Sequence, residues 1–202
     1  MKPYYDEDGI TIFCGDCREI LPHLPQVDLV LTDPPYGIGI ANNPVRQAHE
    51  RKAWDDAPPS SELISLAATV APHAVIWGGN YFELPPAKGF FVWDKLQPQN
   101  FSLAMCEQAW TNFDSPAKMF KKSVLSYEKL HPTQKPVELM TWCLSFFPDA
   151  QTILDPFMGS GTTLVAAKQL GRKAIGIEIE EKYCEIAVQR LAQKVMDFGS
   201  AA

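Results

Sequence analysis

The stretch 155–163 (DPFMGSGTT) constrains the fold of this chain more than any other part of the sequence. It follows the short apolar run 152–154 and leads into a helix-like apolar pattern over 162–170, so we expect it to join a strand to a helix. Its glycines let the backbone pass close to a ligand at the helix N-terminus, where free N–H groups attract polar groups. The stretch therefore predicts a nucleotide-like ligand at the carboxyl end of a strand.

The rest of the chain alternates between strand-like and helix-like patterns. We expect the runs 105–113 and 117–120 to form an antiparallel pair. The alternation predicts an α/β fold with a mostly parallel sheet and helices on both faces. The other expected strands are 11–14, 27–32, 74–77, 89–93, 152–154 and 174–177, and the expected helices are 18–24, 61–70, 136–147, 162–170 and 180–195.

Size and composition favour one globular domain over residues 1–202, since 46% of the residues are apolar and 21% charged. No apolar run is long enough to span a membrane, and the first residues lack the apolar stretch of a secretory signal, so we expect a cytoplasmic protein without a membrane partner. The cysteines include one C-x-x-C pair, Cys14 and Cys17, with no second pair to complete a zinc site. We expect no metal.

Three classes of nucleotide ligand compete for the glycine turn. A Walker loop needs a lysine after Gly161, and a dinucleotide fingerprint needs a third glycine where Leu164 stands, so both fit badly. Glu178 ends the next expected strand and is placed to accept hydrogen bonds from ribose hydroxyls. A ribose without a pyrophosphate suits S-adenosylmethionine. The alternatives are an ordinary connection at the turn and an exposed, helix-capping role for Glu178.

The motif Asp33-Pro34-Pro35-Tyr36 follows the expected strand 27–32 directly, so it lies at the edge of the sheet where open α/β folds bind ligands. Its prolines stiffen the turn. An acceptor oxygen of Asp33, joined by the Pro34 carbonyl, could hold the hydrogens of an aromatic amine and aim its lone pair at a methyl sulfonium. Tyr36 offers a ring on which a flipped base can stack. The alternative is a rigid turn without function.

These segments together resemble the amino-group DNA methyltransferases, which carry a D-P-P-Y catalytic motif and a D-P-F-x-G-S-G-T-T cofactor motif. Other landmarks of that family are GDC (15–17), WGGNYF (77–82), VWDK (92–95) and HPTQKP (131–136). The catalytic motif comes first and the cofactor motif last, as in the circularly permuted beta class. The resemblance covers nearly the whole chain and implies a Rossmann-like methyltransferase fold.

The resemblance also implies roles for individual residues toward S-adenosylmethionine. Asp16 and Cys17 would lie against the adenine of the cofactor, Lys135 and Thr133 near its carboxylate end, and Glu178 on its ribose. The expected cofactor residues are Asp16, Cys17, Asp33, Thr133, Lys135, Asp155, Phe157, Gly159, Ser160, Gly161, Thr162 and Glu178.

In this family an aspartate at the start of the catalytic motif leans toward adenine and a serine toward cytosine. Asp33 therefore implies methylation of adenine at N6 in double-stranded DNA. Methylation of cytosine at N4, an RNA substrate, and an idle protein that only binds cofactor or DNA remain alternatives. A nicotinamide oxidoreductase is opposed by Leu164 at the third glycine position.

Recognition of DNA has to come from few residues. Only the segment 96–130 separates the W-D-K and H-P-T landmarks, so the target-recognition segment is small, and we interpret 38–59 as a mobile loop that helps to read DNA. A solvated loop without function is the alternative. The net charge of −6 argues against binding by charge alone, and a homodimer is attractive because it would enlarge the DNA-contacting surface. The expected DNA contacts are Arg46, Arg51, Lys52, Lys121 and Lys122.

Overall fold

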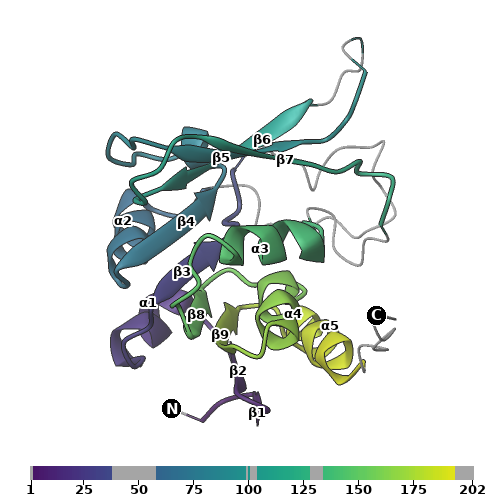
Figure 1. Cartoon of the computed structure of the whole chain (residues 1–202). Coiled ribbons are helices and arrows are strands. Elements are labelled where there is room, and N and C mark those ends of the chain that lie inside the picture. Colours follow the sequence, from purple (N-terminus) through teal and green to yellow (C-terminus); the bar gives the residue numbers. More distant parts are fainter. Residues whose placement is uncertain (1, 38–57, 99, 101–103, 128–133, 194–202) are drawn as a thin grey trace.

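The computed structural model describes residues 2–37, 58–98, 100, 104–127 and 134–193. Their strands form one sheet in the order β1-β2-β9-β8-β3-β4-β6-β5-β7 (Figure 1). The strands are β1 (Tyr5–Glu7), β2 (Ile10–Cys14), β3 (Leu29–Thr32), β4 (His73–Trp77), β5 (Phe90–Asp94), β6 (Cys106–Thr111), β7 (Lys118–Lys121), β8 (Thr152–Asp155) and β9 (Lys173–Glu178). The helices are α1 (Cys17–Ile20), α2 (Ser61–Thr69), α3 (Val137–Leu144), α4 (Thr162–Gln169) and α5 (Glu181–Ala192), with short 3₁₀ turns η1 (Leu21–His23) and η5 (Gly79–Tyr81).

The expected α/β architecture is confirmed. Strands β2, β9, β8, β3 and β4 run parallel to one another, and β6 continues the sheet antiparallel to β4. Helices α1 and α2 cover one side of the sheet, and α3, α4 and α5 cover the other (Figure 1). Strand β1 pairs antiparallel with β2. It was not expected because its three residues, Tyr-Asp-Glu, form no apolar or alternating pattern in the sequence.

One expected strand pairing is wrong. We expected 117–120 to pair with 105–113, but β7 lies parallel to β5, with Phe91 opposite Lys118. Strand β6 already pairs with β4 on one edge and with β5 on the other. A strand has only two hydrogen-bonding edges, so β7 adds to the free edge of β5 instead.

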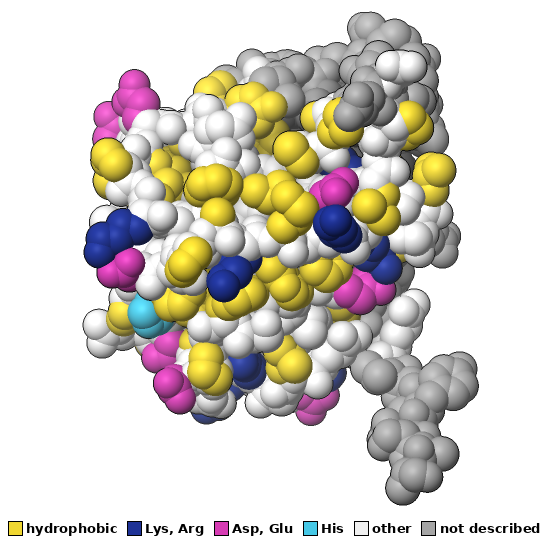
Figure 2. Space-filling model, turned by 45° about the horizontal axis from the view of Figure 1, so that its top comes forward, with side chains coloured by type: hydrophobic (Ala, Val, Ile, Leu, Met, Phe, Trp, Pro, Cys, Tyr) yellow, Lys and Arg dark blue, Asp and Glu magenta, His cyan; other side chains and the backbone are white. Residues whose placement is uncertain are grey.

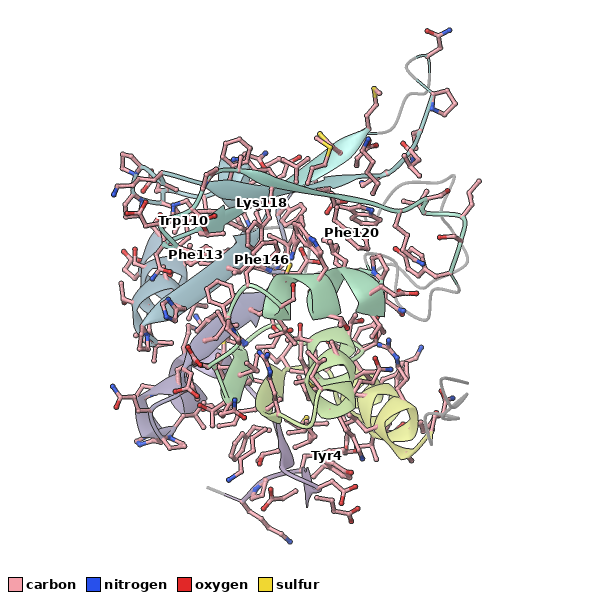
Figure 3. The ribbon with its side chains drawn as sticks, in the orientation of Figure 1. Tyr4, Trp110, Phe113, Lys118, Phe120 and Phe146 are labelled. Carbon is pink, nitrogen blue, oxygen red and sulfur yellow. The ribbon has the colours of Figure 1, made fainter. Side chains whose placement is uncertain are left out.

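The core has two parts, one on each side of the sheet, because alternate residues of a strand point to opposite faces. On β3, Leu29 and Leu31 pack with the helices α3 to α5, whereas Val30 packs with α1 and α2. Aromatic rings on α3 and just after it pack against β5 and β7. The ring of Trp142 on α3 lies 5.0 Å from that of Phe91 and 5.5 Å from that of Phe120, and Phe146, two residues after the helix, lies 5.0 Å from Phe91 (Figure 3). Part of the segment 96–130 is built into the sheet, as β6 and β7.

Helix ends follow the local sequence. Ser60 caps α2 by accepting a hydrogen bond from the Leu63 N–H, as the sequence favours. Gly161 precedes α4 with a φ of +78°, and Gly171 follows it with a φ of +67°. Both values lie in the left-handed region where glycine is the least strained residue. In the described part of the chain, no helix combines the length and apolar character that a membrane span requires.

This topology determines where a ligand can bind. The carboxyl ends of the parallel strands β2, β3, β8 and β9 meet at one edge of the sheet, which is where open α/β folds bind ligands. The residues at these ends are Gly15 and Asp16 after β2, Asp33 after β3, Asp155 at the end of β8 and Glu178 at the end of β9. Motifs that are far apart in the sequence thereby come to one place.

Candidate active site

A cavity of about 410 Å³ opens at this edge of the sheet. Its size falls in the range of small-molecule sites, which is roughly 300–1,000 Å³. Asp33 and Lys135 contribute to its wall as well as Glu178, so the two motif regions share one space. The expected site residues in its wall are Asp16, Cys17, Asp33, Pro34, Pro35, Tyr36, Lys135, Asp155, Phe157, Gly159, Ser160, Thr162 and Glu178.

The glycine turn and Glu178 bind to each other. The Gly159 N–H donates to Glu178 Oε2 at 3.0 Å, and the Glu180 N–H donates to Oε1 at 2.8 Å. The contact with Glu180 lies at the start of α5, as expected for a helix-capping role of Glu178. The Glu178 side chain, however, is largely buried in the cavity wall, whereas that alternative expected it to be exposed. Burial raises the pKa of Glu178 to about 7, since no cation is among its main partners.

Gly161 lies on the side of this turn that faces α5 and does not line the cavity. A Cβ on Gly161 would come within 2.8 Å of the Ala187 Cβ on α5, so the approach of helix and turn requires glycine. Asp155 fixes the other side of the turn: its carboxylate accepts the Thr32 hydroxyl at 2.7 Å and the Phe157 N–H at 3.1 Å. Burial raises the pKa of Asp155 to about 6. Asp155 thus ties the turn to β3, which leads to Asp33.

Arg190 is a residue of this site that the sequence did not reveal. From α5, its guanidinium donates to the Ser160 carbonyl at 2.6 Å, to the Ser160 hydroxyl at 3.0 Å and to the Thr162 hydroxyl at 3.1 Å. These hydrogen bonds hold Ser160 and Thr162, the two residues that flank Gly161 at the start of α4. Arg190 lies on an amphipathic helix, where an arginine is usually solvated, so no signal in the sequence marked it.

Asp16 and Cys17 also line the cavity, at the start of α1 and close to Glu178, whose carbonyl accepts the Gly15 N–H at 2.9 Å. The Asp16 carboxylate accepts the Arg18 backbone N–H at 2.8 Å and is paired with the Arg18 guanidinium. The Arg18 side chain, through its hydrogen bonds, holds the pKa of Asp16 below its ordinary value. Burial raises the pKa of Cys17 to about 11, so its thiol is neutral and can pack against an apolar ring. These properties do not favour a redox role for the C-x-x-C pair.

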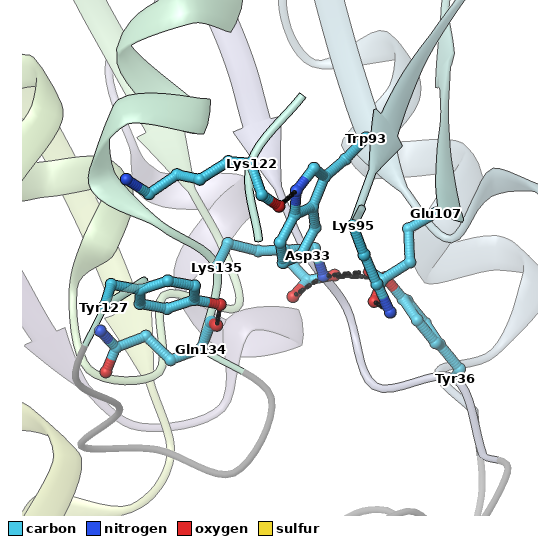
Figure 4. A network of polar contacts seen from close by, with 9 residues as sticks. All are labelled: Asp33, Tyr36, Trp93, Lys95, Glu107, Lys122, Tyr127, Gln134 and Lys135. Carbon is cyan, nitrogen blue, oxygen red and sulfur yellow. Dashed lines mark hydrogen bonds and ion pairs between the residues drawn. The ribbon is translucent and has the colours of Figure 1, made fainter. Parts of the chain in front are cut away.

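A chain of buried charges surrounds Asp33 (Figure 4). Lys135 Nζ lies 2.6 Å from Asp33 Oδ2 and 2.8 Å from Glu107 Oε2, and Lys95 Nζ lies 2.5 Å from Glu107 Oε1. The Tyr36 hydroxyl donates to Asp33 Oδ1 at 2.6 Å and accepts from Lys135 at 3.1 Å. Only 4% of the Lys135 side chain is exposed, so its ammonium is committed to these partners.

The neighbouring charges shift the pKa values of Lys135, Glu107 and Asp33. Burial alone would lower the pKa of Lys135, but Asp33 and Glu107 together raise it, so the lysine stays protonated. Burial would raise the pKa of Glu107, yet Lys135 and Lys95 lower it to about 2. For Asp33 burial prevails and raises the pKa, with Lys135 opposing it. The resemblance implied a place for Lys135 near the cofactor carboxylate; in the structure its nearest partners are Asp33, Glu107 and Tyr36.

The ring of Tyr36 belongs to an aromatic group. It stacks on Tyr81, with centroids 4.8 Å apart and ring planes 18° from parallel, and meets the edge of Phe82 at 6.2 Å. Gly78 lets the ring lie this close, because a Cβ there would come within 2.1 Å of a ring carbon of Tyr36. The W-G-G-N-Y-F landmark therefore packs directly against the D-P-P-Y motif. Tyr81 is 46% exposed and accessible from outside.

Some expected residues lie elsewhere. Lys121 is exposed at the end of β7, and the Lys122 ammonium lies 3.0 Å from Glu138 on α3. Arg46, Arg51, Lys52 and Thr133 fall outside the described residues, as does 38–57 of the expected loop. Residues of the cavity wall that we did not anticipate include Ser60 and Leu63 of α2 and Ile179 and Tyr183 near the start of α5. Of these, Ile179 could have been noticed as an apolar residue beside an acid at a strand end.

Comparisons with known proteins find relatives over most of the chain. A protein-family model described as DNA methylase matches residues 76–189. The type II methyltransferase M2.DpnII of Streptococcus pneumoniae is 33% identical over 94% of this chain and 92% of its own length, and the type II methyltransferase M2.LlaDCHI of Lactococcus lactis is 29% identical over the same shares. Among solved structures, the complex of M1.HpyAVI with SAM is 26% identical and has a TM-score of 0.63, covering 91% of this chain and 100% of that chain. The PvuII cytosine-N4-specific DNA methyltransferase, 18% identical with a TM-score of 0.68 over 96% and 90%, shares the fold.

Proposed function

Because this chain belongs to the DNA methyltransferases that modify exocyclic amino groups, we propose that it methylates adenine at N6 in double-stranded DNA. Membership of the family establishes S-adenosylmethionine as the methyl donor and an amino group of a DNA base as the acceptor. The choice of adenine is our proposal. The observation that carries it is the Asp33 carboxylate in the wall of the cavity, with the same cavity reaching Glu178.

The residues of the cavity fit an adenosine-bearing cofactor. Glu178 uses each carboxylate oxygen for one backbone N–H and still has lone pairs for ribose hydroxyls, because a carboxylate can accept about four hydrogen bonds. The neutral thiol of Cys17 and the side chain of Ile179 offer apolar surface to a flat ring. We therefore assign Glu178 to the ribose and Asp16 and Cys17 to the adenine end. The circularly permuted order of the two motifs supports the beta class.

Asp33 would act by orienting the amine. The amino group of adenine is a poor nucleophile because its lone pair is delocalised into the ring. An N–H held by the Asp33 carboxylate and a second held by the Pro34 carbonyl would turn that lone pair toward the cofactor. The bound cofactor supplies an electrophilic methyl group on a sulfonium. The new N–C bond would form as the bond between the methyl carbon and sulfur breaks and leaves a neutral thioether, and the proton that the amine then loses would pass to water.

The target base would be held by stacking. A flipped base can lie against the aromatic group of Tyr36, a kind of contact worth about 1–3 kcal/mol per base. Aspartate at position 33 favours adenine by resemblance. Cytosine N4 is the second candidate, favoured by the likeness in fold to the PvuII enzyme. RNA methylation and idle binding have no observation of their own in support.

DNA contacts and assembly complete the proposal. We propose that the exposed Lys121 and the residues Arg46, Arg51 and Lys52 meet the DNA backbone, with a smaller part for Lys122 because Glu138 pairs with it. Hydrophobic side chains gather over the face that carries β5 to β7 (Figure 2), including Phe90 at 37% and Met119 at 57% exposure. This face supports a homodimer, which sedimentation with and without DNA would test. A cytoplasmic location remains a prediction.

The test is a product analysis. The purified protein is incubated with methyl-labelled S-adenosylmethionine and unmethylated DNA, and the DNA is digested to nucleosides that are identified by mass. Label in N6-methyl-2′-deoxyadenosine that disappears with Asp33→Ala is the expected result. Label in N4-methylcytosine would keep the site and overturn the choice of base. Binding of cofactor without transfer to DNA, while an RNA substrate accepts the label, would move the proposal to RNA.

A further inference from the structure

Glu107 lies in the charge chain around Asp33 but is not part of either motif or of the cavity wall. It stands on β6, opposite Trp93 of β5 in the strand register. One of its oxygens faces Lys95 and the other faces Lys135. Four charges therefore alternate in sign along the chain, in the order Asp33, Lys135, Glu107, Lys95.

This arrangement is more than is needed to bury Asp33. A single buried carboxylate is compensated by one lysine, and Lys135 already provides it at 2.6 Å. Glu107 adds a second carboxylate, whose side chain is 21% exposed and which is paired in turn with Lys95 at 2.5 Å. Each added buried ion carries a desolvation cost, so a packed apolar pair would stabilise the fold at least as well. Stability alone does not explain the second ion pair.

Glu107 instead restricts the orientation of the Lys135 ammonium group. Lys135 has a long side chain with rotational freedom of its own. Its ammonium has three donors, and the structure gives it three acceptors, on Asp33, Tyr36 and Glu107. Without Glu107 it would keep two acceptors and gain freedom to turn from Asp33 into the cavity, whose wall it shares.

We infer that Glu107, held by Lys95, is a positioning residue that keeps Lys135 on the Asp33 carboxylate and so fixes the orientation of the group that receives the target amine. This inference rests on the proposed function, since it takes Asp33 as the residue that orients the amine. It also gives β6 a role beyond the sheet, because Glu107 lies between the W-D-K and H-P-T landmarks, where base recognition was expected.

The test compares Glu107→Gln with the wild type in single-turnover methyl transfer at saturating S-adenosylmethionine. We expect the rate constant to fall roughly tenfold or more, since small misplacements of a reacting group are costly. The dissociation constant for S-adenosylmethionine should change less than about twofold, as Glu107 does not line the cavity. Cys106→Ser, an exposed neighbour on the same strand, is the matched control and should keep the wild-type rate.

The pH profile separates positioning from a purely structural role. Lys135 faces Asp33, Tyr36, Glu107 and, at 5.8 Å, the ring of Trp77, with Lys95 beyond Glu107. Loss of the Glu107 charge removes one of the two carboxylates that keep Lys135 protonated. The alkaline limb of the rate profile should therefore move to lower pH in Glu107→Gln. A structural defect would lower the rate without moving that limb.

A second variant covers the case in which Glu107→Gln does not fold. Lys95→Met with Glu107→Gln removes one acid and one base, so the buried charges stay balanced, and the same loss of rate is expected. Wild-type rates in both variants would overturn the inference. So would a loss of cofactor affinity as large as the loss of rate, because Lys135 would then serve the cofactor. A wild type that transfers no methyl group to DNA would instead overturn the proposed function, and the inference with it.

Discussion

Two carboxylates, Asp33 and Glu178, line one cavity and are held in different ways. Glu178 is bound by two backbone N–H groups, both within twenty residues of it in the sequence. Asp33 is bound by a tyrosine hydroxyl and by a lysine that is 102 residues away. The first site is made by a local turn, and the second is made by the meeting of distant segments.

The difference shows what each carboxylate is suited to do. Glu178 has no cation among its main partners and keeps a pKa of about 7, so its charge is easily satisfied by new donors such as hydroxyl groups. Asp33 is fixed on both oxygens before any substrate arrives. A group that binds should accept new partners, whereas a group that orients a reacting amine should already be rigid. The comparison predicts that changes at the two ends affect different measurements.

The largest effect is expected from Asp33→Asn. The amide keeps the size of the side chain but loses the charge that pairs with Lys135 and one of the two acceptor oxygens. We expect the rate of methyl transfer to fall by about 100-fold or more, as for the loss of one preorganised group in an active site. The dissociation constant for S-adenosylmethionine, measured by calorimetry, should stay within about threefold of the wild type.

Glu178→Gln is the matched change at the other end and should give the reverse pattern. Replacing the carboxylate weakens hydrogen bonds from ribose hydroxyls, which are worth about 1.5–3 kcal/mol when the acceptor is charged. The dissociation constant for S-adenosylmethionine should rise roughly tenfold or more. The single-turnover rate at saturating cofactor should change little. If both variants lose rate and affinity alike, the two ends do not have separate tasks.

Arg190→Met tests whether the cofactor end depends on support from α5. The variant keeps much of the aliphatic volume but removes the donors to Ser160 and Thr162. We expect a several-fold rise in the dissociation constant for S-adenosylmethionine, smaller than for Glu178→Gln, because Arg190 acts through the turn. Gln189→Ala, an exposed change at the next residue, is the control. An unchanged affinity in Arg190→Met would show that the turn is rigid without the arginine.

The same contrast explains what the sequence could predict. The glycine turn, Glu178 and the D-P-P-Y motif are local patterns at strand ends, and the cavity wall contains nearly all the residues expected from them. The alternation of strands and helices predicted the sheet. The wrong partner for β7 arose because nothing in 117–120 shows which neighbouring strand has a free edge.

Glu107, Lys95 and Arg190 could not be predicted for a similar reason. Each acts on a residue that is far away in the sequence, and a charged side chain on a strand or an amphipathic helix is usually solvated. Lys95 was visible only as part of the W-D-K landmark. Their roles depend on which strands become neighbours: β6 pairs with β5 at Trp93 and thereby brings Glu107 to Lys95.

The smallest effect concerns stability and follows from the pKa of Glu178. The folded cofactor-free protein holds a proton on Glu178 up to a pH of about 7, whereas the unfolded chain releases it near the ordinary value of 4.5. The stabilising contribution of this proton is present below pH 4.5 and is lost as the pH rises to 7 and above. The Glu178→Gln variant has no ionisable group at this position, so its stability does not fall for this reason as the pH rises. We therefore expect the variant to gain a few degrees in melting temperature relative to the wild type between pH 5 and pH 8.

The difference between the two proteins is the quantity to follow in this experiment, because Asp155, with a pKa raised to about 6, has the same pH dependence in both. The melting temperature in the presence of S-adenosylmethionine is a second measurement. If ribose hydroxyls donate to the ionised carboxylate, the cofactor should raise the melting temperature of the wild type more at pH 8 than at pH 6. In Glu178→Gln that pH dependence should largely disappear. A difference in melting temperature that stays constant from pH 5 to pH 8 would mean that Glu178 is already ionised in the cofactor-free protein, and the two carboxylates would then differ only in their partners.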